Sequence, residues 1–190
     1  GTADRGITGV GFQPDWVWIK NRTDASSHKI FDSVRGAGLE IESDTTDAQV
    51  GTLNAGKLPS FDSDGFTVSS SNTVNGSSDN MVAWNWHTGA TASSNSNGSI
   101  TSSVSANTTA GFSIVSYTGT GSSATIGHGL GAVPKMIISK SLASGEHWGT
   151  YHASLGNGKA LALNLHDAAG TNSSYWNNTT PTNQVFSVTS

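Results

Sequence analysis

Three carboxylates alternate along one short segment of the chain, at Glu40, Glu42 and Asp44. Alternate residues of a β-strand share one face, and glycoside hydrolases present an acid and a nucleophile as two neighbouring carboxylates. A second stretch, 120 residues further on (160 − 40 = 120), matches this segment but holds Ala160 and Ala162 at the equivalent positions. We therefore expect a solvated strand face here and no catalytic centre.

Asp62 and Asp64 also alternate, and Gly65 follows them directly. Short calcium loops use this pattern because a hard cation needs several oxygen ligands around a tight turn. The second stretch has Thr182 and Gln184 in place of the two carboxylates. Asp62 and Asp64 are thus a weak calcium candidate, and a polar turn is the favoured interpretation. The 6 His residues show no repeated ligand spacing, so no metal site is predicted.

Aromatic side chains are the usual platforms for sugars, because a pyranose ring stacks on an aromatic face while amides bind its hydroxyl groups. One polar stretch, Tyr175-Trp176-Asn177-Asn178, combines both kinds of group among turn-forming residues. These four residues are the candidate ligand contact of the chain. The competing interpretation is a loop that packs its aromatic rings against its own fold.

Two further tryptophan pairs alternate along the chain, Trp16 with Trp18 and Trp84 with Trp86, so each pair shares a strand face. The second stretch has methionine and isoleucine at the positions of Trp16 and Trp18. These positions therefore require apolar bulk more than an indole ring. We expect them to belong to the core.

The composition excludes several classes of function. The chain contains no cysteine, which excludes disulfides, thiolate metal sites and cysteine nucleophiles. A net charge of −4 at pH 7 with few Lys and Arg residues argues against a nucleic-acid partner. No run approaches the roughly 18 to 20 apolar residues of a membrane-spanning helix, so no membrane partner is expected. No cofactor is predicted, because the sequence has no recognisable phosphate-binding loop or catalytic triad.

The two matching stretches form an internal repeat. Residues 11–20 align with residues 131–140, and Pro14 meets Pro134 at an offset of 120 residues (134 − 14 = 120). The offset stays constant over roughly sixty positions, which indicates two copies of one structural unit. Further matched pairs are Phe31 with Tyr151, Gly36 with Gly156, Gly38 with Gly158, Ile41 with Leu161 and Phe66 with Phe186.

Each copy has the pattern of a β-sheet protein. Short apolar segments recur about every ten residues between Gly and Asn turns, a spacing typical of sandwiches and barrels. Residues 16–19 and 136–138 are apolar enough to predict strands that are buried on both sides. Charged residues make up only 12% of the chain, and its many Ser, Thr and Asn residues disfavour helices. We predict an all-β fold, an antiparallel β-sandwich of jelly-roll type built from two copies of one unit.

The predicted boundaries follow from the repeat. The first copy occupies residues 1–90 and the second occupies residues 111–190, with a Ser/Thr/Asn-rich connection at residues 91–110. The polar stretch 88–107 has two open interpretations. It is either a flexible linker between two lobes or a polar strand-and-turn excursion, since Ile100 and Val104 are spaced apolar residues among β-compatible ones.

Several strings resemble a repeat in virion proteins of marine tailed bacteriophages. They are Gly-Phe-Gln-Pro-Asp-Trp-Val-Trp-Ile-Lys at 11–20, Met-Val-Ala-Trp-Asn-Trp at 81–86 and Gly-Phe-Ser-Ile-Val-Ser-Tyr-Thr-Gly at 111–119. The resemblance implies a concanavalin-like or laminin-G-like jelly roll. It also implies that a complete unit opens with a strand like 111–119 and closes with one like 81–86. By that pattern the first copy lacks its opening strand and the second its closing strand, unless the two complete one continuous sandwich.

The resemblance implies a function in a tail-fibre-like appendage. We expect a non-enzymatic structural module, in the virion or outside the cell, whose partners are other virion proteins and further copies of itself. A lectin-like contact with a cell-surface glycan would serve host attachment. The alternative is a carbohydrate-binding or glycan-degrading module of a secreted enzyme, for which Glu40 and Glu42 are the residues to test.

Overall fold

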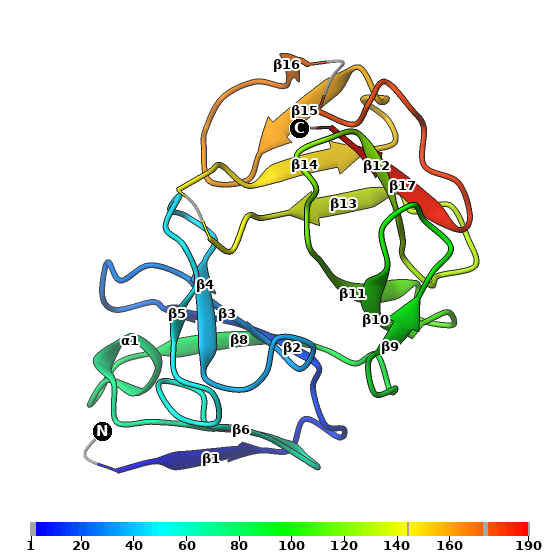
Figure 1. Ribbon diagram of the computed structural model, residues 1–190. Helices are drawn as coiled ribbons and strands as arrows, with labels where there is room; N and C mark the ends of the chain where they lie inside the picture. The colour runs from blue at the N-terminus through cyan, green and yellow to red at the C-terminus, as the bar shows by residue number, and fades with distance from the viewer. Residues whose placement is uncertain (1–2, 144, 173–174, 190) are drawn as a thin grey trace. The chain divides into compact units, whose positions relative to one another are not determined.

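The computed structural model describes residues 3–143, 145–172 and 175–189, and β-strands make up nearly all of its regular structure (Figure 1). The chain forms two compact units. Unit 1 comprises Gly1–His87 and Leu142–Glu146, and unit 2 comprises Thr88–Ser141 and His147–Ser190. The strands of each sheet pair antiparallel, and this confirms the predicted all-β fold of sandwich type.

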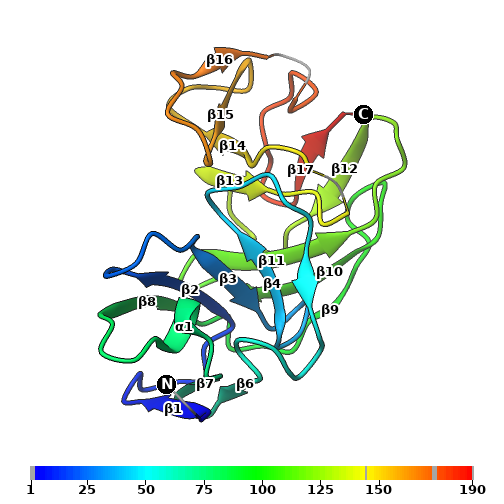
Figure 2. The ribbon, with the colours of Figure 1, turned by 90° about the vertical axis from the view of Figure 1, so that its left-hand side faces the viewer.

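Unit 1 consists of two sheets and one short helix. Its elements are β1 (Arg5–Thr8), β2 (Trp16–Asn21), β3 (Lys29–Asp32), β4 (Leu39–Glu42), β5 (Val50–Gly51), β6 (Ser60–Asp62), β7 (Gly65–Val68), α1 (Asn72–Asn75) and β8 (Met81–Trp86). One sheet has the strand order β1-β7-β6 and the other has the order β5-β4-β3-β2-β8. Figure 2 shows β8, β2, β3 and β4 beside one another in that order.

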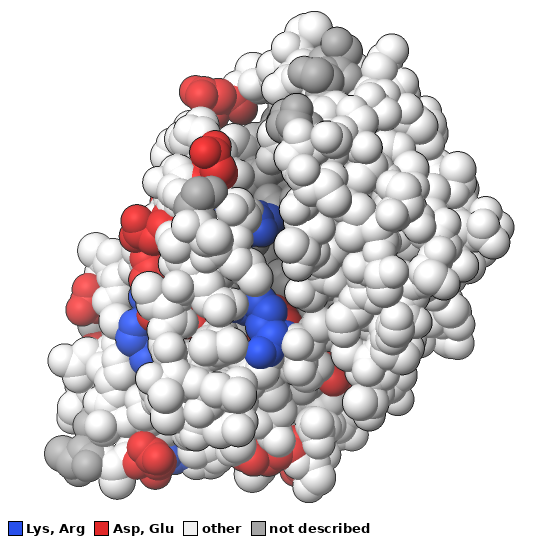
Figure 3. Space-filling view, in the orientation of Figure 1, with Lys and Arg blue, Asp and Glu red and all other residues white. Residues whose placement is uncertain are grey.

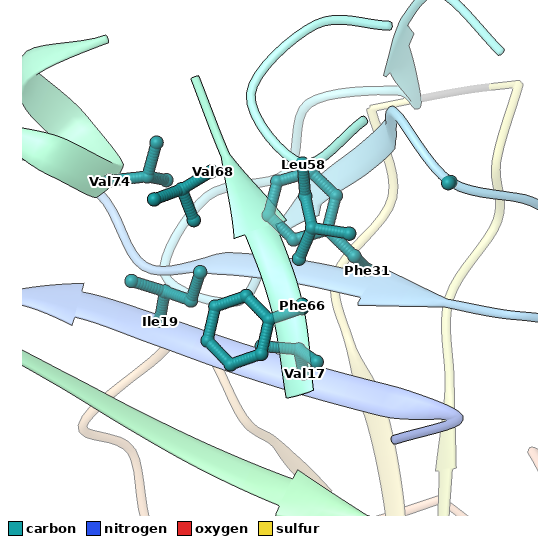
Figure 4. Packing of buried hydrophobic residues seen from close by; sticks show 8 residues of the cluster. Val17, Ile19, Phe31, Leu58, Phe66, Val68 and Val74 are labelled. Carbon is teal, nitrogen blue, oxygen red and sulfur yellow. The ribbon is translucent and has the colours of Figure 1, made fainter. Parts of the chain in front are cut away.

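The core of unit 1 lies between these two sheets. Phe66 and Val68 of β7 point toward Val17 and Ile19 of β2, and Leu58 fills the space beside them (Figure 4). All five side chains are buried. Full burial of such a side chain stabilises the fold by about 1.5–3 kcal/mol relative to its exposure, so this cluster contributes to the stability of unit 1.

Burial along β2 alternates from residue to residue. Val17 and Ile19 are buried in the core, whereas Trp16 and Trp18 on the opposite face are half-buried. The prediction that this apolar segment is buried on both sides is therefore wrong for β2. The assignment of Trp16 and Trp18 to the core is corrected with it, because only one face of the sheet packs against β7.

Unit 2 consists of three sheets. Its strands are β9 (Ser93–Asn95), β10 (Ser102–Asn107), β11 (Phe112–Tyr117), β12 (Ala124–Gly127), β13 (Met136–Ser139), β14 (Gly149–His152), β15 (Lys159–Ala162), β16 (Gly170–Thr171) and β17 (Val185–Val188). The sheet orders are β11-β10-β9, β12-β17 and β13-β14-β15-β16. Two of these strands, β9 and β10, lie in the polar stretch 88–107, so the strand-and-turn interpretation of that stretch is the one observed.

Aromatic residues dominate the core of unit 2. Tyr151, Trp176 and Phe186 are buried together with Ile126. The rings of Tyr151 and Trp176 meet edge to face with their centroids 5.8 Å apart. Such aromatic pairs stabilise a fold by about 0.5–1.5 kcal/mol beyond the contribution of their buried area, so this pair adds to the stability of unit 2.

The two units share a strand order and a register. The order β5-β4-β3-β2 of unit 1 corresponds to β16-β15-β14-β13 of unit 2. Val17 pairs with Phe31, and Ile137 pairs with Tyr151, at an offset of 120 residues in both cases (137 − 17 = 120; 151 − 31 = 120). This correspondence supports the internal repeat, which stays a prediction. Next to β2 the five-stranded sheet continues with β8, whereas the four-stranded sheet ends at β13.

Candidate functional site

The charged side chains on the face shown in Figure 3 gather over part of it and leave a wide area without charge. Other charged side chains of unit 1 are buried, around Lys29 of β3. Lys29 Nζ lies 3.6 Å from Glu40 Oε1 and also contacts Glu42 across the β3–β4 pair. The ammonium group of Lys57 donates to the same Glu40 oxygen at 2.5 Å. The two alternating carboxylates of β4 therefore share a face, as predicted, but that face holds lysines.

Burial makes this cluster a packing element of the fold. Glu40 and Lys29 are only 3% and 4% exposed, so the prediction of a solvated strand face is wrong for Glu40. Desolvation lowers the pKa of the Lys29 ammonium, while the neighbouring Glu40 carboxylate acts in the opposite direction. A buried carboxylate with one oxygen between two ammonium groups is poorly placed to bind a sugar or to donate a proton to one.

Unit 2 fills the equivalent place without charges. Gly149 stands where unit 1 has Lys29 (149 − 29 = 120), and the equivalents of Glu40 and Glu42 are alanines. A Cβ atom at Gly149 would overlap the phenol ring of Tyr175. The tyrosine ring thus occupies the space above β14 that a side chain would otherwise take. The same position in the repeat is stabilised by ion pairs in one unit and by an aromatic ring in the other.

The four residues of the predicted ligand contact lie in two environments. Tyr175 and Trp176 pack within unit 2, whereas Asn177 and Asn178 are exposed to solvent. Trp176 is 1% exposed, lies in the core of unit 2 and packs against Tyr175 with ring centroids 5.1 Å apart. Asn177 and Asn178 are exposed and adopt positive φ angles of 50° and 45°. The tryptophan face is therefore taken up by the fold, and ligand contact through the two asparagines stays a prediction.

The weak calcium candidate at Asp62 and Asp64 is occupied by protein donors. The carboxylate of Asp64 accepts hydrogen bonds from the backbone N–H groups of Gly11 at 2.7 Å and Gly9 at 3.0 Å. Both bonds lower the pKa of this carboxyl, and the bond from Gly11 has the larger effect. Asp62 accepts the Ser60 hydroxyl at 2.8 Å. Among the described residues, no group of three or more His, Asp or Glu side chains gathers as a metal site would. The two carboxylates hold turns together, as the favoured interpretation has it.

Two exposed tryptophans lie on β8, and their alternation in the sequence already indicated that they share a strand face. Trp84 and Trp86 are 44% and 37% exposed and lie on one face of the strand. The Trp84 ring meets the Trp18 ring edge to face with centroids 5.9 Å apart. Alternation along 81–86 was visible in the sequence. The alternation could not reveal that this face is exposed, because exposure depends on which elements pack over the sheet.

A shallow hollow of about 390 Å³ lies on the β9–β10–β11 sheet. Serine and threonine hydroxyls line it, including those of Thr101 and Ser103, together with the ring of Tyr117. The lining carries no charged side chain. Its chemistry suits a neutral ligand rich in hydroxyl groups.

Comparison with known proteins gives a family. A family model described as "Domain of unknown function (DUF7483)" matches residues 1–190, so the chain belongs to this family. No curated protein and no solved structure matches the chain. Among the described residues, no helix is both long and apolar enough to cross a membrane.

Proposed function

We propose that this DUF7483 chain is a non-enzymatic structural module of an extracellular appendage, of the kind found in phage tail fibres. The observation that carries the proposal is the engagement of Glu40 by Lys29 and Lys57. The strongest acidic cluster of the sequence contributes to packing, so the residues best suited to glycan hydrolysis have another role. The assignment to a virion appendage rests on the resemblance of residues 11–20, 81–86 and 111–119 to repeats of tailed-phage proteins.

An activity assay tests the non-enzymatic part of this proposal. Purified chain is incubated with a panel of bacterial surface polysaccharides, and new reducing ends are measured against a Glu40→Gln/Glu42→Gln variant. We expect no new reducing ends with either protein. Reducing ends that the wild type releases and the variant does not, while the variant still unfolds cooperatively, would assign Glu40 and Glu42 to catalysis and overturn the proposal.

A second experiment tests the appendage. Antibodies against the chain are applied to intact virions of a phage that encodes it, and gold label is located by electron microscopy. We expect label along the tail or its fibres. Label that is absent from the particles, while infected-cell lysate reacts with the antibody, would exclude a structural role in the virion.

Glycan binding is a second candidate function, favoured by the hydroxyl-lined hollow beside Tyr117. Ser103 is exposed within the lining, so Ser103→Trp would fill the hollow without removing a core side chain. A glycan array with wild type, Ser103→Trp and the matched surface variant Thr108→Trp tests this function. Binding that only Ser103→Trp abolishes would support it. Equal binding by all three proteins, or none by any, would reject this hollow as the site.

A further inference from the structure

The sheet of unit 2 ends on a strand whose sequence suits a buried position. β13 reads Met-Ile-Ile-Ser, and it stands last in the order β13-β14-β15-β16, as the outermost arrow of that sheet in Figure 1. Met136 and Ile138 are 51% and 36% exposed, and Val133 just before the strand is 42% exposed. An apolar edge of this kind presents backbone N–H and C=O groups for pairing with another strand.

Unit 1 shows which kind of strand an edge of this type accepts. β2, the counterpart of β13, pairs with all six residues of β8, from Trp16 with Trp86 to Asn21 with Met81. β8 reads Met-Val-Ala-Trp-Asn-Trp and carries no charge. Among the described residues, the edge of β13 has no strand in the place that β8 takes beside β2.

β8 is itself the last strand of its sheet, and Trp84 and Trp86 make one face of it apolar and exposed. Five of the eight exposed large hydrophobic residues in the described part of the chain lie on β8 or at β13: Trp84, Trp86, Val133, Met136 and Ile138. β8 contains none of the Lys, Glu or Pro residues that proteins use to protect an edge from pairing, and at β13 such residues lie only outside the strand, at Pro134 and Lys135 before it and Lys140 after it. Both strands are therefore apolar and uncharged along their length.

We propose that the β8 edge of one chain pairs with the β13 edge of a second copy of the same chain. Trp84 and Trp86 would then lie beside Met136 and Ile138 on one face of a sheet that continues from unit 1 of one copy into unit 2 of the next. This proposal rests on the two strand edges and is independent of the proposed place in an appendage.

The contact joins two different edges, so it is heterologous. Each added copy leaves one β8 edge and one β13 edge open, and growth continues until a ring closes or a filament forms. A contact between two β8 edges or two β13 edges would instead stop at a dimer. Complementary edge variants distinguish these possibilities.

Sedimentation velocity with two lysine variants provides the test. Trp84→Lys places a charge on the β8 edge and Ile138→Lys places one on the β13 edge. We expect the assemblies of the wild type to become larger as the protein concentration rises, and we expect each variant alone to stay monomeric. An equimolar mixture should give dimers and nothing larger, because one intact edge of each kind remains. A wild type that stays monomeric throughout, or a mixture that stays monomeric, would overturn the proposal.

Two controls keep the result interpretable. Leu165→Lys alters another exposed apolar residue, which lies outside both β8 and β13, and this variant should associate like the wild type. Cooperative thermal unfolding shows that each variant is folded. If a lysine variant does not fold, a synthetic peptide of residues 80–87 replaces it. This peptide should stop the assembly of the wild type, and a scrambled peptide should not. Assembly that neither peptide changes would contradict the pairing.

Discussion

Glu40 and Glu42 face Lys29 across the β3–β4 pair, and Lys57 approaches Glu40 from outside that pair. The sequence predicted that the two carboxylates share a face, because alternation along a strand is a local property. It did not predict their burial or their lysine partners. Lys57 lies far along the chain from Glu40, and such a contact depends on the tertiary fold.

Removing the charge of Glu40 tests the structural role of the cluster. Glu40→Gln leaves the buried Lys29 with a weaker partner, and the loss of one member of a buried ion pair costs about 3–5 kcal/mol. We expect the free energy of unfolding in urea to fall by about 3 kcal/mol. The exposed Glu146→Gln should change it by less than about 0.5 kcal/mol. Equal stability of the two variants would argue against a packing role for Glu40.

His128 links the stability of unit 2 to pH. Its ring is buried, its Nδ1 accepts the Leu130 N–H at 3.2 Å, and its Nε2 lies 3.2 Å from the Thr182 carbonyl. Burial lowers the pKa of His128 below its ordinary value of 6.5, while the bond to Thr182 acts in the opposite direction. A proton on Nδ1 would also turn it from acceptor to donor and break its bond with Leu130.

The lowered pKa of His128 determines whether stability rises or falls with pH. Below pH about 6.5 the unfolded chain binds a proton at His128 that the folded chain resists, so stability falls as the pH decreases. We expect the thermal midpoint of unit 2 to drop between pH 7.5 and 5.5 in the wild type and to drop less in His128→Gln. The exposed His166→Gln is the control and should follow the wild type. If the thermal midpoint of His128→Gln drops as much as that of the wild type, the pH dependence comes from other groups.

At the scale of elements, the repeat predicted the central strands of the two larger sheets. Strands at 16–19, around Phe31 and near residue 40, with their counterparts 120 residues later, follow from Gly and Pro punctuation and apolar runs. The burial of these strands was harder to predict. The same apolar pattern gives a core-facing strand in β2 and a more exposed strand in β13, which is the last strand of its sheet among the described residues.

The loop that carries Tyr175 shows the same limit. Its composition indicates a ligand-binding surface as readily as a packed loop, and the decisive residue, Gly149, lies in another element. A glycine within a strand often marks a close approach of another group, and that is the signal by which the packing could have been found.

Gly149→Ala tests this packing. The new Cβ would overlap the Tyr175 ring, and overpacking of a core costs typically about 1–3 kcal/mol. We expect unit 2 to lose stability in this range by urea denaturation. Tyr175→Ala in the same chain should remove most of the additional cost of Gly149→Ala. If the two changes are additive in a double-mutant cycle, the ring does not lie over Gly149.

At the scale of the whole molecule, the two units are similar in strand order but different in what completes them. Unit 1 has β8 beside β2, whereas unit 2 leaves β13 at the edge of its sheet. The proposed contact between these edges would provide a route from one copy to the next. Repeated contacts of this kind would fit the proposed role as a structural module of a fibre.

Hydrogen–deuterium exchange at low and high protein concentration tests the central claim, that copies of this module join through β8 and β13. The account predicts that amides of Met81–Trp86 and Met136–Ser139 exchange more slowly at high concentration in the wild type but not in Ile138→Lys. Amides of β3 and β14, which have strands on both sides, should exchange alike at both concentrations. Exchange in β8 and β13 that is independent of concentration, in wild type that sediments as oligomers, would contradict the account.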